Sequence, residues 1–315
     1  MRKISFVIPC YRSEKTISKV VEEIIDTVKA RGGYTYEIIL VSDRSPDNVF
    51  QVIKELALND SNIIGIELAR NFGQHSALMA GYSECTGDIV ISLDDDGQTP
   101  ADELFTLVDK LDEGYDVVYG AYPTIRQSLF RIFGSKVNKL MMEKLIGKPK
   151  HIEANSYFAC KRFIVKELLR YKNSYPYVGG LIFRATSNIA NVTTNQRERM
   201  GGRSGYSLKK LLSLWMNGFT AFSIKPLRFA TFTGIISAFI GFVFGIYTTV
   251  QKFVRPTVQA GWSSTMAVML FIGGMIMFIL GLIGEYVGRI YICINNSPQY
   301  VIRETTNIEK DKRYQ

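Results

Sequence analysis

Two long uncharged stretches near the C-terminus constrain the fold of this chain more than any other feature. No charged residue occurs from Phe229 to Gln251 or from Pro256 to Gly284. A helix needs about 20 mostly apolar residues to cross a bilayer, and both stretches are longer than that. A buried helical hairpin in a soluble protein is the alternative, but such length and neutrality favour two membrane-spanning helices.

The residues before the first span are expected to lie in the cytoplasm. The N-terminal apolar run Ile4–Ile8 is short and stops at Pro9, which indicates a first β-strand rather than a signal peptide. Two spans would return the C-terminal tail to the same side of the membrane. Basic residues before the first span and after the second fit this orientation; they are Lys209, Lys210, Lys225, Arg228, Arg289 and Arg303. The loop between the spans also holds two basic residues, Lys252 and Arg255.

The formal net charge of +9 raises the question of an anionic partner. Basic residues beside membrane spans suit anionic headgroups and lipid phosphates, so the lipid bilayer is the predicted partner. Nucleic acid ranks last, because no nucleic-acid-binding module is identifiable. The four cysteines lack metal-ligand or redox spacing, and two isolated histidines do not indicate a metal site.

Residues 3–120 alternate between strand-like and helix-like segments. Strands are expected at Ile4–Ile8, Glu37–Val41, Ile63–Leu68, Ile89–Leu93 and Asp116–Tyr119, and helices at Glu14–Ala30, Asp47–Leu58, Gln74–Cys85 and Pro100–Glu113. This alternation predicts βαβ units and a mostly parallel α/β sheet with flanking helices. The Gly-rich dinucleotide fingerprint is absent after the first strand, which argues against NAD or FAD.

An acidic loop follows the strand expected at Ile89–Leu93. Ligands of open α/β sheets bind at the carboxyl ends of strands. Asp94 and Asp96 can turn toward one hard cation, with Asp95 between them as a spacer and Gln98 supplying a neutral oxygen. Mg²⁺ and Mn²⁺ prefer such oxygen ligands and commonly bridge to nucleotide phosphates. A solvated acidic turn is the alternative, which the position after a strand disfavours.

Four regions are expected along the chain. Residues 1–206 form the α/β domain, 207–226 an amphipathic helix, 227–290 the two-span hairpin and 291–315 a cytoplasmic tail. The segment Ser207–Ile224 carries apolar residues on one helical face with Lys209 and Lys210 beside it, which is typical of a helix lying on the membrane surface. Packing of that face against the α/β domain is the alternative.

Several motifs together resemble a known family. They are Ser5–Tyr11, Glu37–Asp47, Arg70–His75, the loop Asp94–Gln98 and Arg199–Tyr206, followed by the two spans. In order and spacing they are similar to family 2 glycosyltransferases. The narrower resemblance is to polyprenyl-phosphate glycosyltransferases, the group that includes dolichol-phosphate mannose synthase and bactoprenol glucosyltransferases.

This resemblance implies a GT-A fold, a nucleotide-sugar donor, a divalent cation (Mg²⁺ or Mn²⁺) and a lipid-phosphate acceptor. By matching position, it implies a nucleoside pocket lined by Pro9, Tyr11, Glu14 and Asp43, with Asp94 and Asp95 also at the nucleotide. It implies a DxD motif of Asp94 and Asp96, with Gln98 as its metal-side amide. It also implies phosphate contacts at Arg126 and Arg131, and a closing loop with Arg199 and Ser204.

The chemistry of transfer agrees with these roles. A cation held by Asp94 and Asp96 would neutralise the negative charge that develops on the departing diphosphate. Arginine suits bidentate phosphate recognition, which favours Arg126 and Arg131, although a headgroup-facing charge is the alternative for each. A phosphate acceptor is already anionic, so a strong general base is not required. Direct displacement at the anomeric carbon would invert its configuration.

The chain departs from the family pattern at four positions. Ser156 and Phe158 stand where many relatives have Asp and Arg, so this chain lacks the carboxylate to which an acceptor-site or base role would be carried over. Gly205 replaces a frequent Lys in the closing loop, whose glycines could instead offer backbone amides to phosphate. Ser42 replaces the first carboxylate of an acidic pair, which leaves Asp43 as the nucleoside-binding candidate.

The predicted function is inverting transfer of one sugar from a UDP-sugar to undecaprenyl phosphate, for modification of a cell-envelope glycan. A GDP-sugar is the competing donor. A processive polysaccharide synthase is the alternative enzyme, but neither Trp215 nor Trp262 lies in a Gln-x-x-Arg-Trp motif. A degenerate transferase acting as a membrane scaffold is the non-enzymatic alternative. The spans could also support a homo-oligomer.

Overall fold

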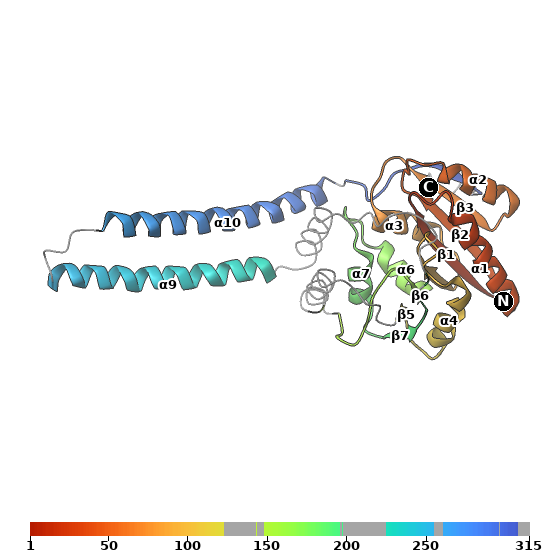
Figure 1. Cartoon of the computed structure of the whole chain (residues 1–315), viewed down its shortest axis with the longest axis horizontal. Coiled ribbons are helices and arrows are strands. Elements are labelled where there is room, and N and C mark those ends of the chain that lie inside the picture. The colour runs from red at the N-terminus through yellow and green to blue at the C-terminus, as the bar shows by residue number, and fades with distance from the viewer. Residues whose placement is uncertain are drawn as a thin grey trace. The chain divides into compact units, whose positions relative to one another are not determined.

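The computed structural model describes residues 1–122, 143, 148–195, 197, 225–254, 261–295 and 297–307. The chain divides into two units (Figure 1). One consists of Met1–Tyr206 together with Asn296–Gln315, and the other of Ser207–Asn295.

The first unit is built on an eight-stranded sheet with the order β7-β5-β6-β4-β1-β2-β3-β8. The strands are β1 (Arg2–Cys10), β2 (Tyr34–Ser42), β3 (Ile63–Leu68), β4 (Ile89–Ser92), β5 (Val117–Ala121), β6 (Phe158–Lys161), β7 (Ile189–Thr193) and β8 (Ile302–Thr306). The pairs β1–β2, β1–β4, β2–β3 and β5–β7 are parallel, whereas β6 and β8 pair antiparallel with their neighbours. The expected mostly parallel α/β fold of the GT-A type is confirmed.

Helices cover both faces of this sheet, because alternate residues of a buried strand point to opposite sides. On one face, Ile4 and Phe6 of β1 join a core with α1 (Ile17–Arg31), α2 (Val49–Asn59) and α4 (Leu104–Asp112). On the other face lies α3 (Gln74–Glu84), where a Cβ on Gly81 would collide with Val7 of β1. The helices α6 (Arg162–Leu169) and α7 (Val178–Ala185) pack beside α3.

The observed elements differ from the expected ones in places. The helix expected at Glu14–Ala30 runs from Ile17 to Arg31, and it is preceded by a turn in which the amides of Thr16 and Ile17 donate to the Ser13 carbonyl oxygen. The helix expected at Pro100–Glu113 is divided into a 3₁₀ turn, η1 (Ala101–Glu103), and α4. The elements β6, α6, α7 and β7 lie in a region where no regular pattern was predicted.

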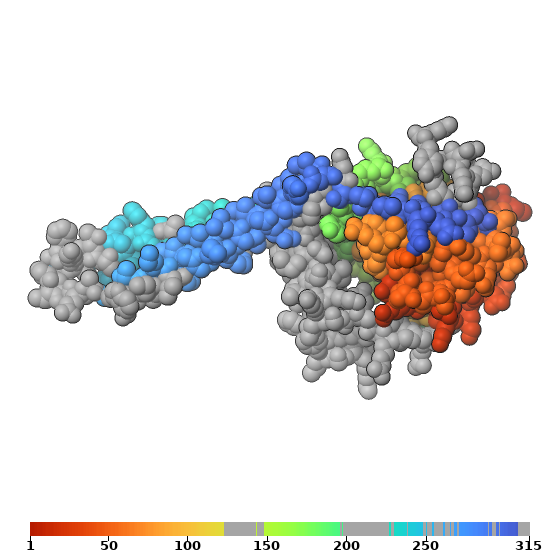
Figure 2. All heavy atoms as spheres, turned by 90° about the horizontal axis from the view of Figure 1, so that it is seen from above, coloured from red at the N-terminus to blue at the C-terminus, as the bar shows by residue number. Residues whose placement is uncertain are grey.

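The chain returns to the sheet after the helical hairpin. Strand β8 pairs antiparallel with β3, and the amide of Gly65 donates a hydrogen bond to Thr306 Oγ1 at 2.9 Å. Figure 2 shows this C-terminal segment, in dark blue, lying across the orange surface of the α/β domain. Residues 291–315 were expected only to form a tail, so this edge strand was not predicted.

The second unit contains two long helices, α9 (Lys225–Val254) and α10 (Trp262–Ile294). Each includes an 18-residue window apolar enough to cross a membrane, Ala230–Tyr247 and Phe271–Gly288. Almost none of either window is buried, which differs from the core helix of a soluble protein. The two expected apolar helices are therefore present. The amphipathic helix predicted at 207–226 falls almost entirely outside the described residues.

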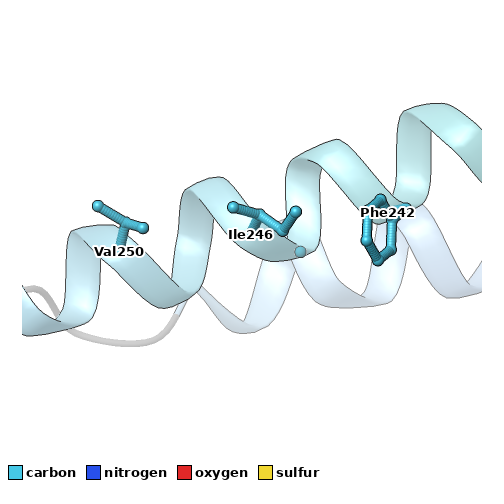
Figure 3. Close-up of a pocket in the computed structure, with 4 residues that line it drawn as sticks. Phe242, Ile246 and Val250 are labelled. Atoms are coloured by element: carbon cyan, nitrogen blue, oxygen red, sulfur yellow. The ribbon is translucent and has the colours of Figure 1, made fainter.

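A shallow pocket on α9 is lined by Phe242, Gly245, Ile246 and Val250 (Figure 3). These residues supply no polar or charged side chain. The pocket therefore offers no group that could perform chemistry.

Candidate active site

The candidate site lies where the loops after β1, β2 and β4 meet at one edge of the sheet. The parallel register places Cys10 opposite Ser42, and Val7 opposite Ser92, so the three strands end close together. The chain leaves these strands through Tyr11–Glu14, Asp43 and the acidic loop Asp94–Gln98, respectively. The carboxyl edge predicted from the sequence is thus where the structure collects these side chains.

The acidic loop is tied to the loop after β1 through Asp95. The backbone amide of Tyr11 donates to Asp95 Oδ2 at 2.9 Å, and Thr16 Oγ1 donates to the Asp95 carbonyl oxygen at 2.6 Å. Burial raises the pKa of Asp95 to about 6, and the charges of Asp94 and Asp96 contribute to the rise. Crowded carboxylates of this kind are relieved by a bound cation.

Both carboxylate oxygens of Asp94 accept hydrogen bonds. Gln74 Nε2 donates to Oδ1 at 3.0 Å, and the hydroxyl of Ser156 donates to Oδ2. Ser156 lies just before β6, whose first residue Phe158 pairs with Ser92 at the end of β4. The position that departs from the family pattern therefore contacts the first carboxylate of the DxD motif directly.

Asp96 and Gln98 form the other end of the acidic loop. Asp96 Oδ1 accepts a hydrogen bond from the Gln98 backbone amide at 3.0 Å. Gln98 is also connected to Arg197, whose amide donates to the Gln98 carbonyl oxygen at 3.1 Å. In the described part of the chain, no three His, Cys, Asp or Glu side chains form a metal-binding group. Two carboxylates suit a Mg²⁺-like ion that takes its remaining oxygens from substrate phosphates and water.

Asp43 is buried and organises the loop that follows β3. Its two carboxylate oxygens accept hydrogen bonds from the backbone amides of Phe72, at 2.7 Å, and Gly73, at 2.8 Å. Burial raises the pKa of Asp43 against the lowering effect of these two amides. Gly73 has a φ of 91°, which only glycine adopts at low cost. The role of Asp43 in a nucleoside pocket stays a prediction, and its contacts show that it holds the Phe72–Gly73 turn.

The loops after β1 and β2 are locked together. Glu14 donates its amide to Asp47 Oδ2 at 3.0 Å and accepts from the Asn48 amide at 3.1 Å. Each loop also contains an arginine with a left-handed backbone, Arg12 with φ 61° and Arg44 with φ 50°. Such conformations are uncommon outside glycine and gather at functional sites.

Two functional candidates were missed in the sequence. Gln74 lies within the Arg70–His75 motif, so its position was indicated although its contact with Asp94 was not. Arg44 points toward Glu67 of β3, with Nη1 at 2.9 Å from Oε1, and no sequence periodicity indicates that pair. The predicted phosphate and closing-loop residues lie outside the described residues, and their roles stay predictions; they are Arg126, Arg131, Arg199 and Ser204.

Comparison with known protein families shows to which family the chain belongs. The model for glycosyl transferase family 2 matches residues 5–169, which include the three loops and Ser156. The chain belongs to glycosyltransferase family 2. A second family model, the GtrB C-terminal hairpin, matches residues 225–290 of this family 2 glycosyltransferase, over both long helices.

Full-length relatives narrow the resemblance. The glycosyltransferase is 33% identical to undecaprenyl-phosphate 4-deoxy-4-formamido-L-arabinose transferase of Klebsiella pneumoniae (strain 342), covering 99% of this chain and 98% of that one. It is 32% identical to the protein of the same name from Yersinia pestis (strain Pestoides F), over 100% and 97%. It is also 32% identical to the uncharacterized glycosyltransferase YkcC of Bacillus subtilis (strain 168), over 98% and 96%. The expected resemblance to polyprenyl-phosphate glycosyltransferases is confirmed.

Solved structures support the fold. Glucosyl-3-phosphoglycerate synthase from Mycobacterium tuberculosis, in complex with phosphoglyceric acid, aligns with a TM-score of 0.52 and 20% identity, over 70% of this chain and 80% of that one. The same synthase in complex with Mn²⁺ and uridine-diphosphate-glucose aligns with a TM-score of 0.50 and 19% identity, over 70% and 76%. At this identity the likeness concerns the α/β fold alone.

Proposed function

We propose that this glycosyltransferase transfers one sugar from a UDP-sugar to undecaprenyl phosphate at the cytoplasmic face of the membrane, with inversion at the anomeric carbon. The observation that carries the proposal is the way neighbouring loops hold the acidic loop: Asp95 accepts a hydrogen bond from the Tyr11 amide after β1, and Asp94 accepts one from Gln74 at the start of α3. A nucleotide sugar laid along this edge would have its nucleoside beside Tyr11 and Asp43 and its diphosphate beside the acidic loop.

The donor set of the acidic loop fits a divalent cation. Asp94 and Asp96 would hold Mg²⁺ or Mn²⁺, with the Gln98 side chain as a further oxygen ligand. When bound, the ion would neutralise charge on the leaving diphosphate. Gln74 and Ser156 orient Asp94 through hydrogen bonds to its two carboxylate oxygens. The mycobacterial synthase of the same fold, solved with Mn²⁺ and uridine-diphosphate-glucose, supports such a pairing.

The acceptor assignment draws on the full-length relatives, whose names specify undecaprenyl phosphate. A phosphate monoester is already ionised near neutral pH, so its oxygen can attack without a strong base. Ser156 cannot serve as a carboxylate base, and this chemistry does not need one. Transfer to a sugar hydroxyl, as in a polysaccharide synthase, would require a base to remove the proton.

The return of the chain to the sheet supports the topology. Because β8 follows α10 and pairs with β3, the sequences on both sides of the hairpin belong to one folded unit. With α9 and α10 as two spans, both ends of the hairpin would lie on the same side of the membrane, in agreement with this pairing. The basic residues flanking the spans support a cytoplasmic location for that unit.

The test is transfer of radiolabelled sugar to undecaprenyl phosphate in vesicles, with UDP-sugars and GDP-sugars compared under Mg²⁺, Mn²⁺ and chelator. The expected product is a lipid carrying one sugar, formed from a UDP-sugar and lost on chelation. Asp96→Ala should reduce turnover by at least about 100-fold, since metal stabilisation of leaving-group charge contributes several kcal/mol. Near-normal turnover in that variant would overturn the metal role, and a polymeric product would overturn the acceptor.

A further inference from the structure

The loop that joins α6 to α7, residues 170–177, is fixed to the segment that leaves α10. Ser174 Oγ donates a hydrogen bond to the carbonyl oxygen of Ser297 at 2.5 Å. The side-chain amide of Gln299 donates to the carbonyl oxygens of Tyr171, at 2.6 Å, and Asn173, at 2.9 Å. Since α10 ends at Ile294, these anchors follow it within a few residues. Ser297 and Gln299 are the third and fifth residues after Ile294, so the 170–177 loop binds the first part of the chain that follows α10.

The outer surface of this loop is basic and aromatic. The side chain of Tyr175 is 60% exposed, and its backbone adopts a left-handed φ of 59°. Arg170 and Lys172 are also exposed, and Glu167 is the acidic side chain beside them, 3.1 Å from Arg170. Tyrosine, with an apolar ring and a polar hydroxyl, is enriched at membrane–water interfaces. Lysine and arginine just outside a membrane are attracted to anionic headgroups.

The other end of the same loop reaches the candidate active site. Tyr177 contacts the ring of His75 edge-on, with centroids 5.0 Å apart and planes at 89°. Burial lowers the pKa of His75 to about 4, so this ring is neutral and packs as an apolar group. The preceding residue, Gln74, donates to Asp94. The loop therefore runs from the α10 exit segment to the neighbourhood of the DxD motif.

We propose that the 170–177 loop is a membrane-contact surface, in which Arg170, Lys172 and Tyr175 bind anionic phospholipid headgroups and thereby hold the Asp94 edge toward the lipid acceptor. This rests on the proposed function, since it takes α9 and α10 as spans and a polyprenyl phosphate as acceptor. Continuity with the end of α10 and complementary charge identify the occupant as the bilayer.

The first test measures contact with lipid directly. In the full-length protein with Cys293→Ser, Tyr175→Cys would carry an environment-sensitive fluorophore; Cys10, Cys85 and Cys160 are buried. The matched control is Leu58→Cys on α2, in the helical layer on the opposite face, where the side chain is 85% exposed. In phosphatidylglycerol vesicles we expect blue-shifted emission, quenched by headgroup-labelled lipid, at position 175 alone. Equal emission and quenching at both positions would overturn the proposal.

The second test separates membrane contact from catalysis. Lys172→Glu combined with Tyr175→Ser should raise the KM for undecaprenyl phosphate in anionic vesicles about tenfold, as expected for reversing one interfacial charge and losing an aromatic anchor. The donor KM and the rate with a short-chain, water-soluble polyprenyl phosphate should change less than twofold. The matched charge reversal is Lys19→Glu on the exposed side of α1. It should leave unchanged the KM for undecaprenyl phosphate, the donor KM and the rate with the water-soluble acceptor.

Equal losses with both acceptors would mean that the variant damages the site itself and would overturn the membrane-contact role. Failure of the proposed function has a different signature, because the unaltered protein would then transfer sugar to neither acceptor. An unchanged KM for undecaprenyl phosphate in anionic vesicles in the double variant would also overturn the proposal that the 170–177 loop contacts the membrane.

Discussion

Ser156 donates its hydroxyl hydrogen bond to the carboxylate of Asp94. Ser156 lies just before β6 and Asp94 just after the adjacent antiparallel strand β4, and Gln74 donates to the other carboxylate oxygen from the start of α3. A serine therefore occupies the place where the family resemblance implies an acid, and its hydroxyl donates to the neighbouring carboxylate. A carboxylate there would repel Asp94 instead.

Removing this hydroxyl should weaken cation binding without abolishing catalysis. Side chains that orient a metal ligand typically contribute 10- to 100-fold to metal affinity. Ser156→Ala is therefore expected to raise the Mn²⁺ concentration for half-maximal activity by about tenfold, with little change in kcat at saturating metal. Measuring activity over a range of Mn²⁺ concentrations would give the half-maximal concentration for each variant. Ser83→Ala, which removes a hydroxyl that donates to the Ala80 carbonyl oxygen within α3, serves as the control. An equal shift in both variants would contradict the role of Ser156.

Asp43 offers a contrasting prediction, because its contacts are to the backbone amides of Phe72 and Gly73 in the loop after β3. An asparagine keeps the shape but can accept from only one of the Phe72 and Gly73 amides through its single oxygen. A hydrogen bond to a charged group contributes about 1.5–3 kcal/mol. Asp43→Asn should therefore raise the donor KM by about tenfold or more and leave the Mn²⁺ dependence unchanged. Equilibrium binding of UDP would check this, with the exposed Asp112→Asn as control; unaltered UDP affinity would exclude the organising role.

The sheet and the place of the site were predictable, because both follow from local patterns. Apolar runs such as Ile89–Leu93 specify buried strands, and polar residues directly after them meet at one edge of a parallel sheet. The partners of those residues were not predictable. Asp95 was interpreted as a spacer, yet its carboxylate accepts the Tyr11 amide, a contact between residues 84 positions apart.

Two of the missed strands, β8 and β6, have a common physical explanation. Strand β8 has only five residues, and its edge position leaves most of its side chains partly exposed, so it lacks the apolar run that marks a buried strand. Strand β6 is also short and pairs antiparallel between β4 and β5, which the βαβ pattern does not anticipate. Both are specified by long-range contacts rather than by local sequence.

At the opposite, amino end of the sheet, the buried carboxylate of Glu37 should contribute to stability with a defined pH dependence. It accepts from Ser5 Oγ and the Thr86 amide, both at 2.5 Å, and pairs with Lys3 Nζ at 2.5 Å. Burial alone would raise the pKa of Glu37, but Lys3 and the other donors outweigh it, so the pKa is lowered from 4.5. Glu37→Gln should reduce the free energy of unfolding by about 2 kcal/mol at neutral pH.

Because the folded-state pKa of Glu37 is lowered, its contribution is complete above pH 4.5 and is lost as the pH falls through the folded-state value. Thermal unfolding in detergent across this range should therefore show the wild-type and Glu37→Gln curves converging only in acid. Asp109→Asn, which breaks an exposed pair with Arg31, should have little effect at any pH. A difference between Glu37→Gln and wild type that does not change with pH would contradict the assignment.

The docking of β8 should depend on Asn307, the residue that follows it. Asn307 Nδ2 donates to the carbonyl oxygens of Ala57, at 2.6 Å, and Ile63, at 2.9 Å. Asn307→Asp removes these donors and sets a carboxylate against carbonyl oxygens, at a cost of about 2–3 kcal/mol. We expect faster amide hydrogen exchange in β3 and β8, while the central pair β1–β4 stays protected because local openings follow local contacts.

Asn307→Gly separates the hydrogen bonds from the backbone conformation. Asn307 has a left-handed φ of 55°, which glycine also adopts at low cost. This variant therefore loses the side-chain amide and its hydrogen bonds but keeps the backbone conformation. The rate of amide hydrogen exchange in β8 of Asn307→Gly should lie between those of wild type and Asn307→Asp, because glycine brings no repulsive carboxylate. Protection of β8 that is equal in all three proteins would mean that the β3–β8 ladder alone holds the strand, and that the anchor at Asn307 contributes nothing measurable.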